Sequence, residues 1–277
     1  MKMNKETKER NVELIEKSKE VVRETFKKYE PAKCAITWTG GKDSTTNLWI
    51  IRQVCLEENI ELPQVITIDE GDAFTEITDF LVTLSKKWHI DLKWLCNFDM
   101  LKCCQSHLGN DIQVKDLDER NQAELKRIEF EFKSFPFEAE SYAGNHLMKT
   151  VVLNKFLEQS KTELLFMALR RDEQAARKED EYFTRHEAGY LMPEHTRVSP
   201  ILHFTERDIW DNTHLHHLPY SSLYKIGYLT LGARTSSNPG EVGIPAWEQD
   251  IENVPERAGR RQDKEKAMER LRKLGYM

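Results

Sequence analysis

Cysteine, glycine and proline are all scarce in this sequence of 277 residues. The five cysteines are odd in number and include no CxxC pair, so we expect neither a disulfide framework nor a zinc ribbon, and a reducing cytoplasm fits best. The 12 glycines and 9 prolines are too few for a low-complexity chain. No apolar run approaches the roughly 18 residues of a membrane helix, and the first residues lack the apolar stretch typical of a secretory signal.

A net positive charge is also lacking. With 41 basic and 47 acidic side chains, the chain has a formal net charge of −6, which argues against a general nucleic-acid binder. The charge is unevenly distributed, because residues 255–277 hold eight Arg or Lys against four Asp or Glu. This tail is therefore a candidate for folding over an anionic ligand, and a solvated amphipathic helix over 263–274 is the alternative.

Strands and helices alternate along most of the sequence. Apolar runs predict buried strands at 34–38, 63–69, 91–96 and 163–169. Apolar spacings of three and four predict helices between them at 45–56, 73–88 and 146–159, with a polar, helical stretch from about 97 to 133. This order predicts an α/β fold with a doubly wound, mostly parallel sheet flanked by helices and an extended C-terminal tail. We divide the chain into an N-terminal helix (1–30), a central domain (31–234) and a C-terminal loop with a basic helix (235–277).

The segment Thr39–Thr45, TGGKDST, joins the first predicted strand to the next helix. Two glycines allow a sharp turn that exposes backbone N–H groups, and a helix N-terminus adds unpaired N–H groups and partial positive charge. Lys42 adds a full charge and Ser44 a hydroxyl group, so the segment predicts phosphate binding. It is not a Walker A loop, because Ile36 and Asp43 stand where that pattern needs Gly and Ser or Thr. The alternative is a capped strand-to-helix turn with a solvated lysine.

This loop resembles the SGGKDS loop of the PP-loop, or adenine nucleotide α-hydrolase-like, superfamily. Its members cut ATP between the α and β phosphates, or bind a related adenylyl nucleotide. Within it, the chain is similar to the phosphoadenosine phosphosulfate reductase and sulfate adenylyltransferase small-subunit family, over about residues 30–277. The similarity is carried by IDEG at 68–71, KT at 149–150, ALRRDE at 168–173, RVSP at 197–200, FTERDIW at 204–210 and ERAGR at 256–260.

The resemblance implies a role for each matching position. Lys42, Arg170 and Arg171 are the implied catalytic residues, which hold pyrophosphate, the α-phosphate or sulfate. The implied nucleotide-binding residues are Thr37, Thr39, Gly40, Gly41, Lys42, Asp43, Ser44, Thr45, Asp69 and Gly71. Further candidates for binding anions are Arg177 and Arg234 and, in the tail, Arg257, Arg260 and Arg261. ATP and Mg²⁺ are the implied cofactors, with the metal carried by the phosphates and Asp43 or Asp69 as candidate ligands.

Simpler interpretations of several residues stay open. Arg170 and Arg171 can form salt bridges with the acidic residues at 172, 173 and 179, and Asp69 can cap the following helix. Trp38 is more typical of a strand core than of an adenine contact. The histidines at 214, 216 and 217 lack a further ligand nearby in sequence, so we expect satisfied or solvated rings rather than a zinc site. The adjacent cysteines at 103 and 104 are expected to remain thiols.

The stretch 227–234, GYLTLGAR, departs from the reductases that it resembles. Those enzymes have GY.SIGC..CT here and a catalytic thiol in a C-terminal ECG.H segment, whereas this chain has Ala233 and no cysteine after Cys104. Without the thiol, the reductase reaction lacks its nucleophile. Together with LPYSSLY at 218–224, the same stretch resembles the FMN adenylyltransferase branch.

The leading hypothesis is therefore an ATP-dependent adenylyltransferase, most like the sulfate adenylyltransferase small subunit, which makes adenylyl sulfate and pyrophosphate. The alternatives are an FMN adenylyltransferase, a cysteine-less member of the reductase family and a nucleotide-binding accessory protein. The resemblance also implies a GTP-binding large subunit as partner, and a homo-oligomer stays open. Residues 97–145 match the sulfate branch poorly, so we expect specificity for the acceptor there.

Overall fold

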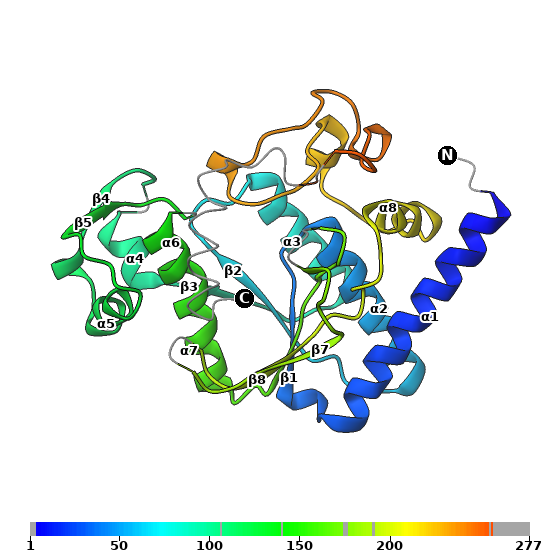
Figure 1. Ribbon diagram of the computed structural model, residues 1–277, viewed down its shortest axis with the longest axis horizontal. Coiled ribbons are helices and arrows are strands. Elements are labelled where there is room, and N and C mark those ends of the chain that lie inside the picture. Colours follow the sequence, from blue (N-terminus) through cyan, green and yellow to red (C-terminus); the bar gives the residue numbers. More distant parts are fainter. Residues whose placement is uncertain are drawn as a thin grey trace.

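A six-stranded sheet forms the centre of the molecule (Figure 1), with the strand order β3-β2-β1-β6-β8-β7. The structure is a computed structural model that describes residues 4–254 and 256, apart from 106, 140, 174–176 and 190–191. β1 pairs in parallel with both β2 and β6, while β7 runs antiparallel to β8. The strands are β1 (Cys34–Thr37), β2 (Gln64–Asp69), β3 (Leu92–Cys96), β6 (Leu164–Phe166), β7 (Phe183–His186) and β8 (His195–Val198). The predicted α/β fold with a mostly parallel sheet is confirmed.

Helices cover both faces of this sheet. α2 (Lys42–Glu58) and α3 (Thr75–Trp88) pack on the face that carries Ile36, and α7 (Val151–Ser160) packs on the face that carries Ala35. The two faces arise because neighbouring residues of a strand point in opposite directions. Two further helices, α1 (Lys5–Lys28) and α8 (Glu206–Leu215), lie against α2 in an outer layer.

Residues 97–145 form a small lobe with its own apolar core, at the left of Figure 1. Its elements are α4 (Phe98–Cys103), β4 (Asp111–Gln113), a 3₁₀ helix (Val114–Asp116), α5 (Glu119–Arg127), β5 (Ser134–Pro136) and α6 (Tyr142–Asn145). The prediction of a helical stretch here is wrong in part, because β4 and β5 form an antiparallel pair. Strands of three residues are too short to produce an alternating pattern that the sequence would reveal.

The predicted helix at 146–159 also differs from the observed structure. A π-helix (His146–Thr150) connects α6 to α7, so one helical run extends from Tyr142 to Ser160 with a wider turn in its middle. In a π-helix each N–H bonds to the carbonyl five residues earlier, and apolar spacing does not show this local change.

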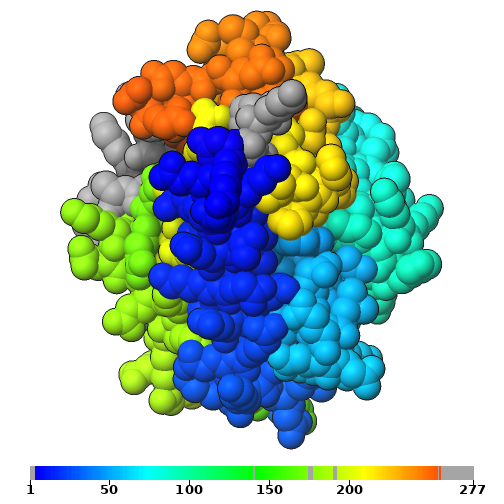
Figure 2. Space-filling view, turned by 90° about the vertical axis from the view of Figure 1, so that its right-hand side faces the viewer, coloured from blue at the N-terminus to red at the C-terminus, as the bar shows by residue number. Residues whose placement is uncertain are grey.

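The C-terminal segment, by which we mean the described residues from 218 to 256, lies above the carboxyl end of the sheet (Figure 1). It has three described 3₁₀ helices, Ser222–Ile226, Arg234–Ser236 and Ala246–Glu248, and its aromatic residues pack with Trp210 of α8. Figure 2 shows α1 running along one face of the molecule beneath this segment. The predicted basic helix at 263–274 and the candidates Arg257, Arg260 and Arg261 lie outside the described residues. Of the helices in the described part, none combines the length and the apolar character needed to cross a membrane.

Candidate functional site

The phosphate loop predicted at 39–45 lies at the carboxyl end of the central strand. The chain runs outward from β1 to β2 and β3 and then returns to β6 on the other side of β1, so its direction across the sheet reverses there. In open parallel sheets this reversal leaves a crevice that binds ligands. The loop after β1 and the segment Ala168–Arg170 after β6 therefore border the expected binding position.

The loop itself has the geometry that phosphate binding requires. Gly40 has φ +78°, and a Cβ atom there would lie 3.1 Å from Ile77, so both the backbone conformation and the packing favour glycine. Gly41 is the N-cap of α2 and provides no side-chain cap for the first N–H groups of the helix. The Ser44 hydroxyl accepts a hydrogen bond from Thr39 N–H (3.3 Å), which holds the turn closed.

Two cations and four carboxylates meet behind this loop, and we call them the charge cluster. Lys42 Nζ lies 3.3 Å from Glu206 and 3.5 Å from Asp43, and it also donates to Glu256 and to the carbonyl oxygen of Leu229. Arg170 binds three carboxylates of the cluster. Its Nε lies 2.7 Å from Asp43, its Nη1 lies 2.9 Å from Asp172, and its Nη2 donates to Glu256. The members are Lys42, Arg170, Asp43, Asp172, Glu206 and Glu256.

The charge cluster shifts the titration of its members. Burial opposes the charge on Lys42, but the carboxylates of Asp43, Glu256 and Glu206 outweigh it and raise the pKa of the ammonium group. Burial raises the pKa of Glu206 to about 7, although Lys42 acts in the opposite direction. Burial likewise raises the pKa values of Asp43 and Asp172 against the effect of Arg170. The cluster thus combines permanent positive charge with carboxyl groups that accept protons readily.

A cavity of about 310 Å³ opens in front of the cluster. Its wall includes seven of the predicted site residues, namely Thr37, Thr39, Gly41, Asp43, Ser44, Asp69 and Arg177. The sheet and α3 provide an apolar part of the wall, with Phe74, Ile77, Leu81 and Trp94. Leu231 of the C-terminal segment also lines the cavity. No cysteine lies among these lining residues of the described chain.

Other predicted residues do not line the cavity. Arg171 turns its guanidinium group to the carbonyl oxygen of Asp180 (2.8 Å), so the structure does not bring it together with Lys42 and Arg170. Arg234 is largely exposed beside Asp72, at 3.6 Å. The other described residues of the prediction, namely Gly40, Lys42, Thr45, Gly71 and Arg170, also lie outside the cavity wall. Thr45 accepts a hydrogen bond from the buried Trp38 ring, which is part of the core as the simpler interpretation predicts.

The β2–α3 connection contains two carboxylates that shape the site. Asp69 accepts the N–H of Gly71 at 2.9 Å and so folds the turn after β2. Asp72, which sequence reasoning missed, is buried and accepts hydrogen bonds from the N–H (3.1 Å) and the hydroxyl group of Thr235. It therefore ties this connection to the C-terminal segment. An aspartate three residues after a predicted strand end gives no sign of such a distant partner.

Three more residues of the site were missed from the sequence. Tyr224 is buried, and its hydroxyl accepts a hydrogen bond from Lys42 N–H at 2.9 Å. Glu206 and Glu256 belong to two of the segments that carry the resemblance, FTERDIW and ERAGR, but neither was singled out as a site residue. The LPYSSLY segment and the FTERDIW segment were recognised as motifs, so a motif search finds the elements but not the contacts of their side chains.

The histidines and the adjacent cysteines form no second centre. His214 packs among Trp210, Tyr220 and Trp247, and His216 packs on Trp49. The five cysteines are all free. Nowhere in the described part of the chain do three or more His, Cys, Asp or Glu side chains come together as they would around a metal ion.

A family model for the phosphoadenosine phosphosulfate reductase domain matches residues 97–239, slightly more than half of the chain. The chain belongs to this family. The match includes the segment after β6, with Arg170, and the C-terminal segment as far as residue 239.

Reductases of the family are also similar in sequence. Phosphoadenosine 5'-phosphosulfate reductase of Xylella fastidiosa (strain 9a5c) is 30% identical over 100 residues, which are 36% of this chain and 40% of that protein. The same enzyme of Xanthomonas euvesicatoria pv. vesicatoria (strain 85-10) is 22% identical over 214 residues, or 77% of this chain and 75% of that protein. The chain thus aligns with only about two fifths of the length of the Xylella relative.

A solved structure shares the fold over nearly the whole chain. Candida glabrata FMN adenylyltransferase in complex with ATP superimposes with a TM-score of 0.66 at 17% identity, covering 95% of this chain and 91% of that chain. At this identity the likeness shows a common fold. The family model thus places the chain in the PP-loop type phosphoadenosine phosphosulfate reductase family, and the solved structure shows the same fold.

The residues of this family member fit the phosphates of ATP. Gly41 and Ser44 at the N-terminus of α2 line one end of the cavity and offer N–H and hydroxyl donors there, and the buried cations Lys42 and Arg170 lie behind this wall. Mg²⁺ has no ready set of ligands among the described side chains, since Asp43 faces Arg170 and Asp69 folds a turn. A metal ion that enters with the nucleotide would be held mainly by the phosphates.

Proposed function

We propose that this chain is an ATP-dependent adenylyltransferase that transfers the adenylyl group of ATP to sulfate. A sulfate oxygen attacks the α-phosphorus and forms the new O–P bond, while the bond between the α-phosphorus and the bridging oxygen breaks. Pyrophosphate leaves with that electron pair, and no proton needs to move. The observation that carries the proposal is the phosphate loop with two buried cations, Lys42 and Arg170, directly behind it.

The residues of the site act by positioning and by neutralising charge. The N-terminus of α2 and Ser44 are suited to hold the departing pyrophosphate, because they present N–H and hydroxyl donors at one edge of the cavity. Lys42 lies buried behind them and contributes its charge from there. Arg177 lies in another part of the wall and is an anion-binding candidate. Sulfate is a weak nucleophile, so holding it in line with the leaving group contributes much of the acceleration. Mg²⁺ on the phosphates would supply further neutralisation.

The pKa values and positions of the thiols support adenylyl transfer rather than a reduction by a thiolate. Burial raises the pKa values of Cys34 and Cys55 to about 12, so neither thiol ionises near neutral pH. Ala233 lies in the cavity wall, in the stretch where the similar reductases have a cysteine. A reductase reaction that needs a thiolate would find none among the described residues that line the cavity.

FMN is the second candidate acceptor. The apolar part of the cavity wall favours it, since Phe74, Ile77 and Trp94 form a surface that a flat aromatic ring can use and that sulfate does not need. Adenine needs a similar surface, so this observation alone does not place FMN ahead of sulfate.

Pyrophosphate release tests the proposal. Purified protein with ATP and Mg²⁺ should release pyrophosphate only when sulfate is added, and FMN in place of sulfate tests the second candidate through the formation of FAD. Lys42→Ala should reduce the rate by about 10²-fold or more, because it removes a charge that holds the leaving group. Lys33→Ala is the matched control, because Lys33 pairs with Glu163 at the surface.

Lys42 is buried, so Lys42→Ala needs a check of folding by circular dichroism. Ser44→Ala offers a milder change at the same loop and should also lower the rate. Normal turnover in a folded Lys42→Ala protein would refute the assignment of the loop. Release that does not depend on either acceptor would refute the transfer reaction.

A further inference from the structure

The π-helix between α6 and α7 is anchored on one side and contributes to the cavity on the other. His146, its first residue, is completely buried, and its Nε2 lies 3.1 Å from the Glu124 carboxylate of α5. Lys149, three residues later, lines the cavity. π-helical turns are rare and occur frequently at functional sites, where they change the direction of a side chain. The wider turn therefore fixes the backbone of Lys149 against the small lobe.

Lys149 forms an ion pair with a carboxylate that a ligand can displace. Its Nζ lies 2.9 Å from Glu70 of the β2–α3 connection, and both side chains are partly exposed, at 31% and 23%. Both also belong to the cavity wall. An ion pair with this exposure contributes little to stability, so an anionic ligand can replace Glu70 at small cost. Lys42 and Arg170 differ, because each cation is itself buried and is held by three carboxylates.

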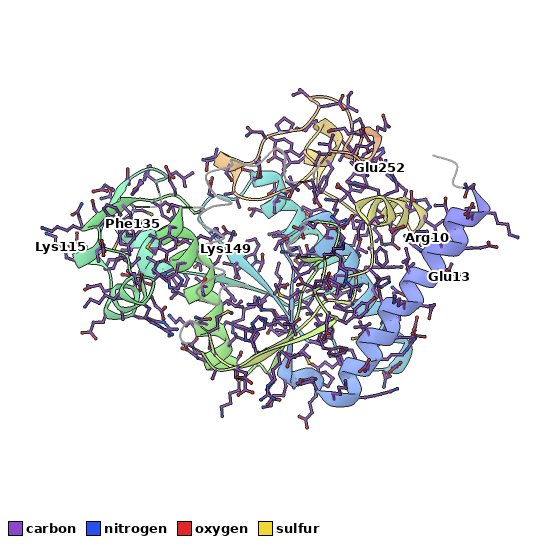
Figure 3. The ribbon with its side chains drawn as sticks, viewed as in Figure 1. Arg10, Glu13, Lys115, Phe135, Lys149 and Glu252 are labelled. Carbon is purple, nitrogen blue, oxygen red and sulfur yellow. The ribbon has the colours of Figure 1, made fainter. Side chains whose placement is uncertain are left out.

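The position of Lys149 relative to the phosphate loop is the decisive observation. The π-helix continues into α7, which covers the opposite face of the sheet from α2. Figure 3 accordingly shows Lys149 beside the helices of the small lobe, away from α2. In a displacement at phosphorus, the nucleophile and the leaving group lie roughly in line on opposite sides. If α2 holds the leaving pyrophosphate, a cation on the α7 side is placed to hold the nucleophile.

We propose that Lys149 binds an anionic oxygen of the acceptor and positions the acceptor for attack on the α-phosphorus, and that Glu70 holds Lys149 in place until the acceptor binds. This inference rests on the proposed function. The acceptor class is an oxyanion, either sulfate or the phosphate monoester of FMN. Lys149 is a positioning residue, and the bonds that form and break are those of the adenylyl transfer described above.

The kinetic test compares variants of Lys149 and of its partner. Lys149→Gln should raise the KM for the acceptor about tenfold or more, with the KM for ATP nearly unchanged, and Lys149→Arg should restore part of the loss because it keeps the charge. Glu70→Gln should lower the KM for the acceptor, since it removes the competing carboxylate. Lys155→Gln is the matched control, because Lys155 is an exposed lysine of α7. Running the series with sulfate and with FMN shows which oxyanion Lys149 serves.

Direct binding separates this inference from the reaction itself. Calorimetry with sulfate, inorganic phosphate and FMN, in the presence of a non-hydrolysable ATP analogue, should show weaker anion binding to Lys149→Gln and unchanged binding of the analogue. An unchanged acceptor KM in an active Lys149→Gln enzyme, or equal anion binding to wild type and variant, overturns the inference. Absence of pyrophosphate release by the wild type instead overturns the proposed function, and the binding comparison still decides the role of Lys149.

Discussion

Lys42 and Arg170 are two buried cations that face four carboxylates, so the charge cluster has an excess of negative charge when all groups are ionised. Burying an excess charge is costly, and carboxyl groups reduce the cost by binding protons. The raised pKa of Glu206, about 7, reflects burial in this surrounding. The affinity of the site for a polyanion should therefore depend on pH near neutrality.

Glu206→Gln tests this dependence. Because the pKa of Glu206 is raised, the group is neutral below about pH 7 and charged above it, and a charged Glu206 beside Lys42 opposes phosphate binding. Going from pH 8 to pH 6, wild type should gain up to about tenfold more affinity for inorganic pyrophosphate than the variant gains. Calorimetry at the two pH values measures the gain in affinity of wild type and of the variant. Because pyrophosphate binds protons equally in the two experiments, its own titration does not affect the difference between the two gains. Equal gains in the two proteins would contradict the prediction.

The sequence predicted the turn and the helix start at residues 39–45, because both are set by one continuous segment. Gly40, Gly41, Lys42 and Ser44 lie there as expected, and their roles in phosphate binding stay predictions. The contact of Glu256 with Lys42 could not be predicted, since only the tertiary fold of the C-terminal segment brings the two residues together. The resemblance implied one shared role for Arg170 and Arg171, but neighbouring residues in an extended segment point in different directions.

At the scale of elements, the β2–α3 connection links the large sheet to the small lobe. Gly71 in this connection has φ +75°, and a Cβ atom there would lie 2.8 Å from the Phe137 ring and 3.0 Å from Leu101. Both neighbours belong to the core of the lobe or pack against it. Glycine is thus required by the backbone and by the close approach of the two units.

Gly71→Ala should destabilise the protein more than a glycine change that affects the backbone alone. We expect about 1–2 kcal/mol for the left-handed backbone and about 1–3 kcal/mol more for overpacking against Phe137. Gly109→Ala is the matched control, because Gly109 has φ +82° with nothing within 4 Å of the added Cβ. Urea unfolding of both variants measures the difference. A loss in Gly71→Ala no larger than in Gly109→Ala would show that the contact with the lobe is unimportant.

Sequence patterns predicted the long elements and missed the short ones. Strands β1 and β2 were found nearly to the residue, because buried parallel strands are continuous apolar runs bounded by turns. β7 and the lobe strands β4 and β5 were missed, since three or four residues carry no clear period and their pairing is set by distant partners. The π-helix could not be predicted either, because the pattern of apolar and polar residues does not distinguish a short π-helical turn from the α-helix around it.

At the scale of the whole molecule, the C-terminal segment folds back on the phosphate loop. Tyr224 binds the backbone of Lys42, the carbonyl oxygen of Leu229 accepts from its ammonium group, and Glu256 reaches both buried cations. Residues more than 180 positions apart in sequence thus complete one site. The carboxylate of Glu256 lies on the same two cations that are suited to phosphate.

Glu256→Gln should strengthen the binding of pyrophosphate several-fold. The change keeps the shape of the side chain and removes a negative charge that competes with phosphate for Lys42 and Arg170. Glu248→Gln, at an exposed position of the same segment, is the control and should bind like wild type. Calorimetry with inorganic pyrophosphate measures whether the variant binds it more strongly or more weakly than wild type. Weaker binding to Glu256→Gln would mean that the carboxylate supports the ligand rather than competes with it.

The central position of β1 has a consequence for how the protein is made. β1 leaves the ribosome early, yet one of its edges pairs with β6, where Cys34 lies beside Leu164, so the small lobe and α7 are synthesised before the middle of the sheet can close. Contacts of such large separation slow folding and expose unpaired strand edges to other chains. The phosphate loop is thus synthesised long before Tyr224, whose hydroxyl group binds the backbone of Lys42. A nascent chain should gain the ability to bind pyrophosphate only after the C-terminal segment has emerged.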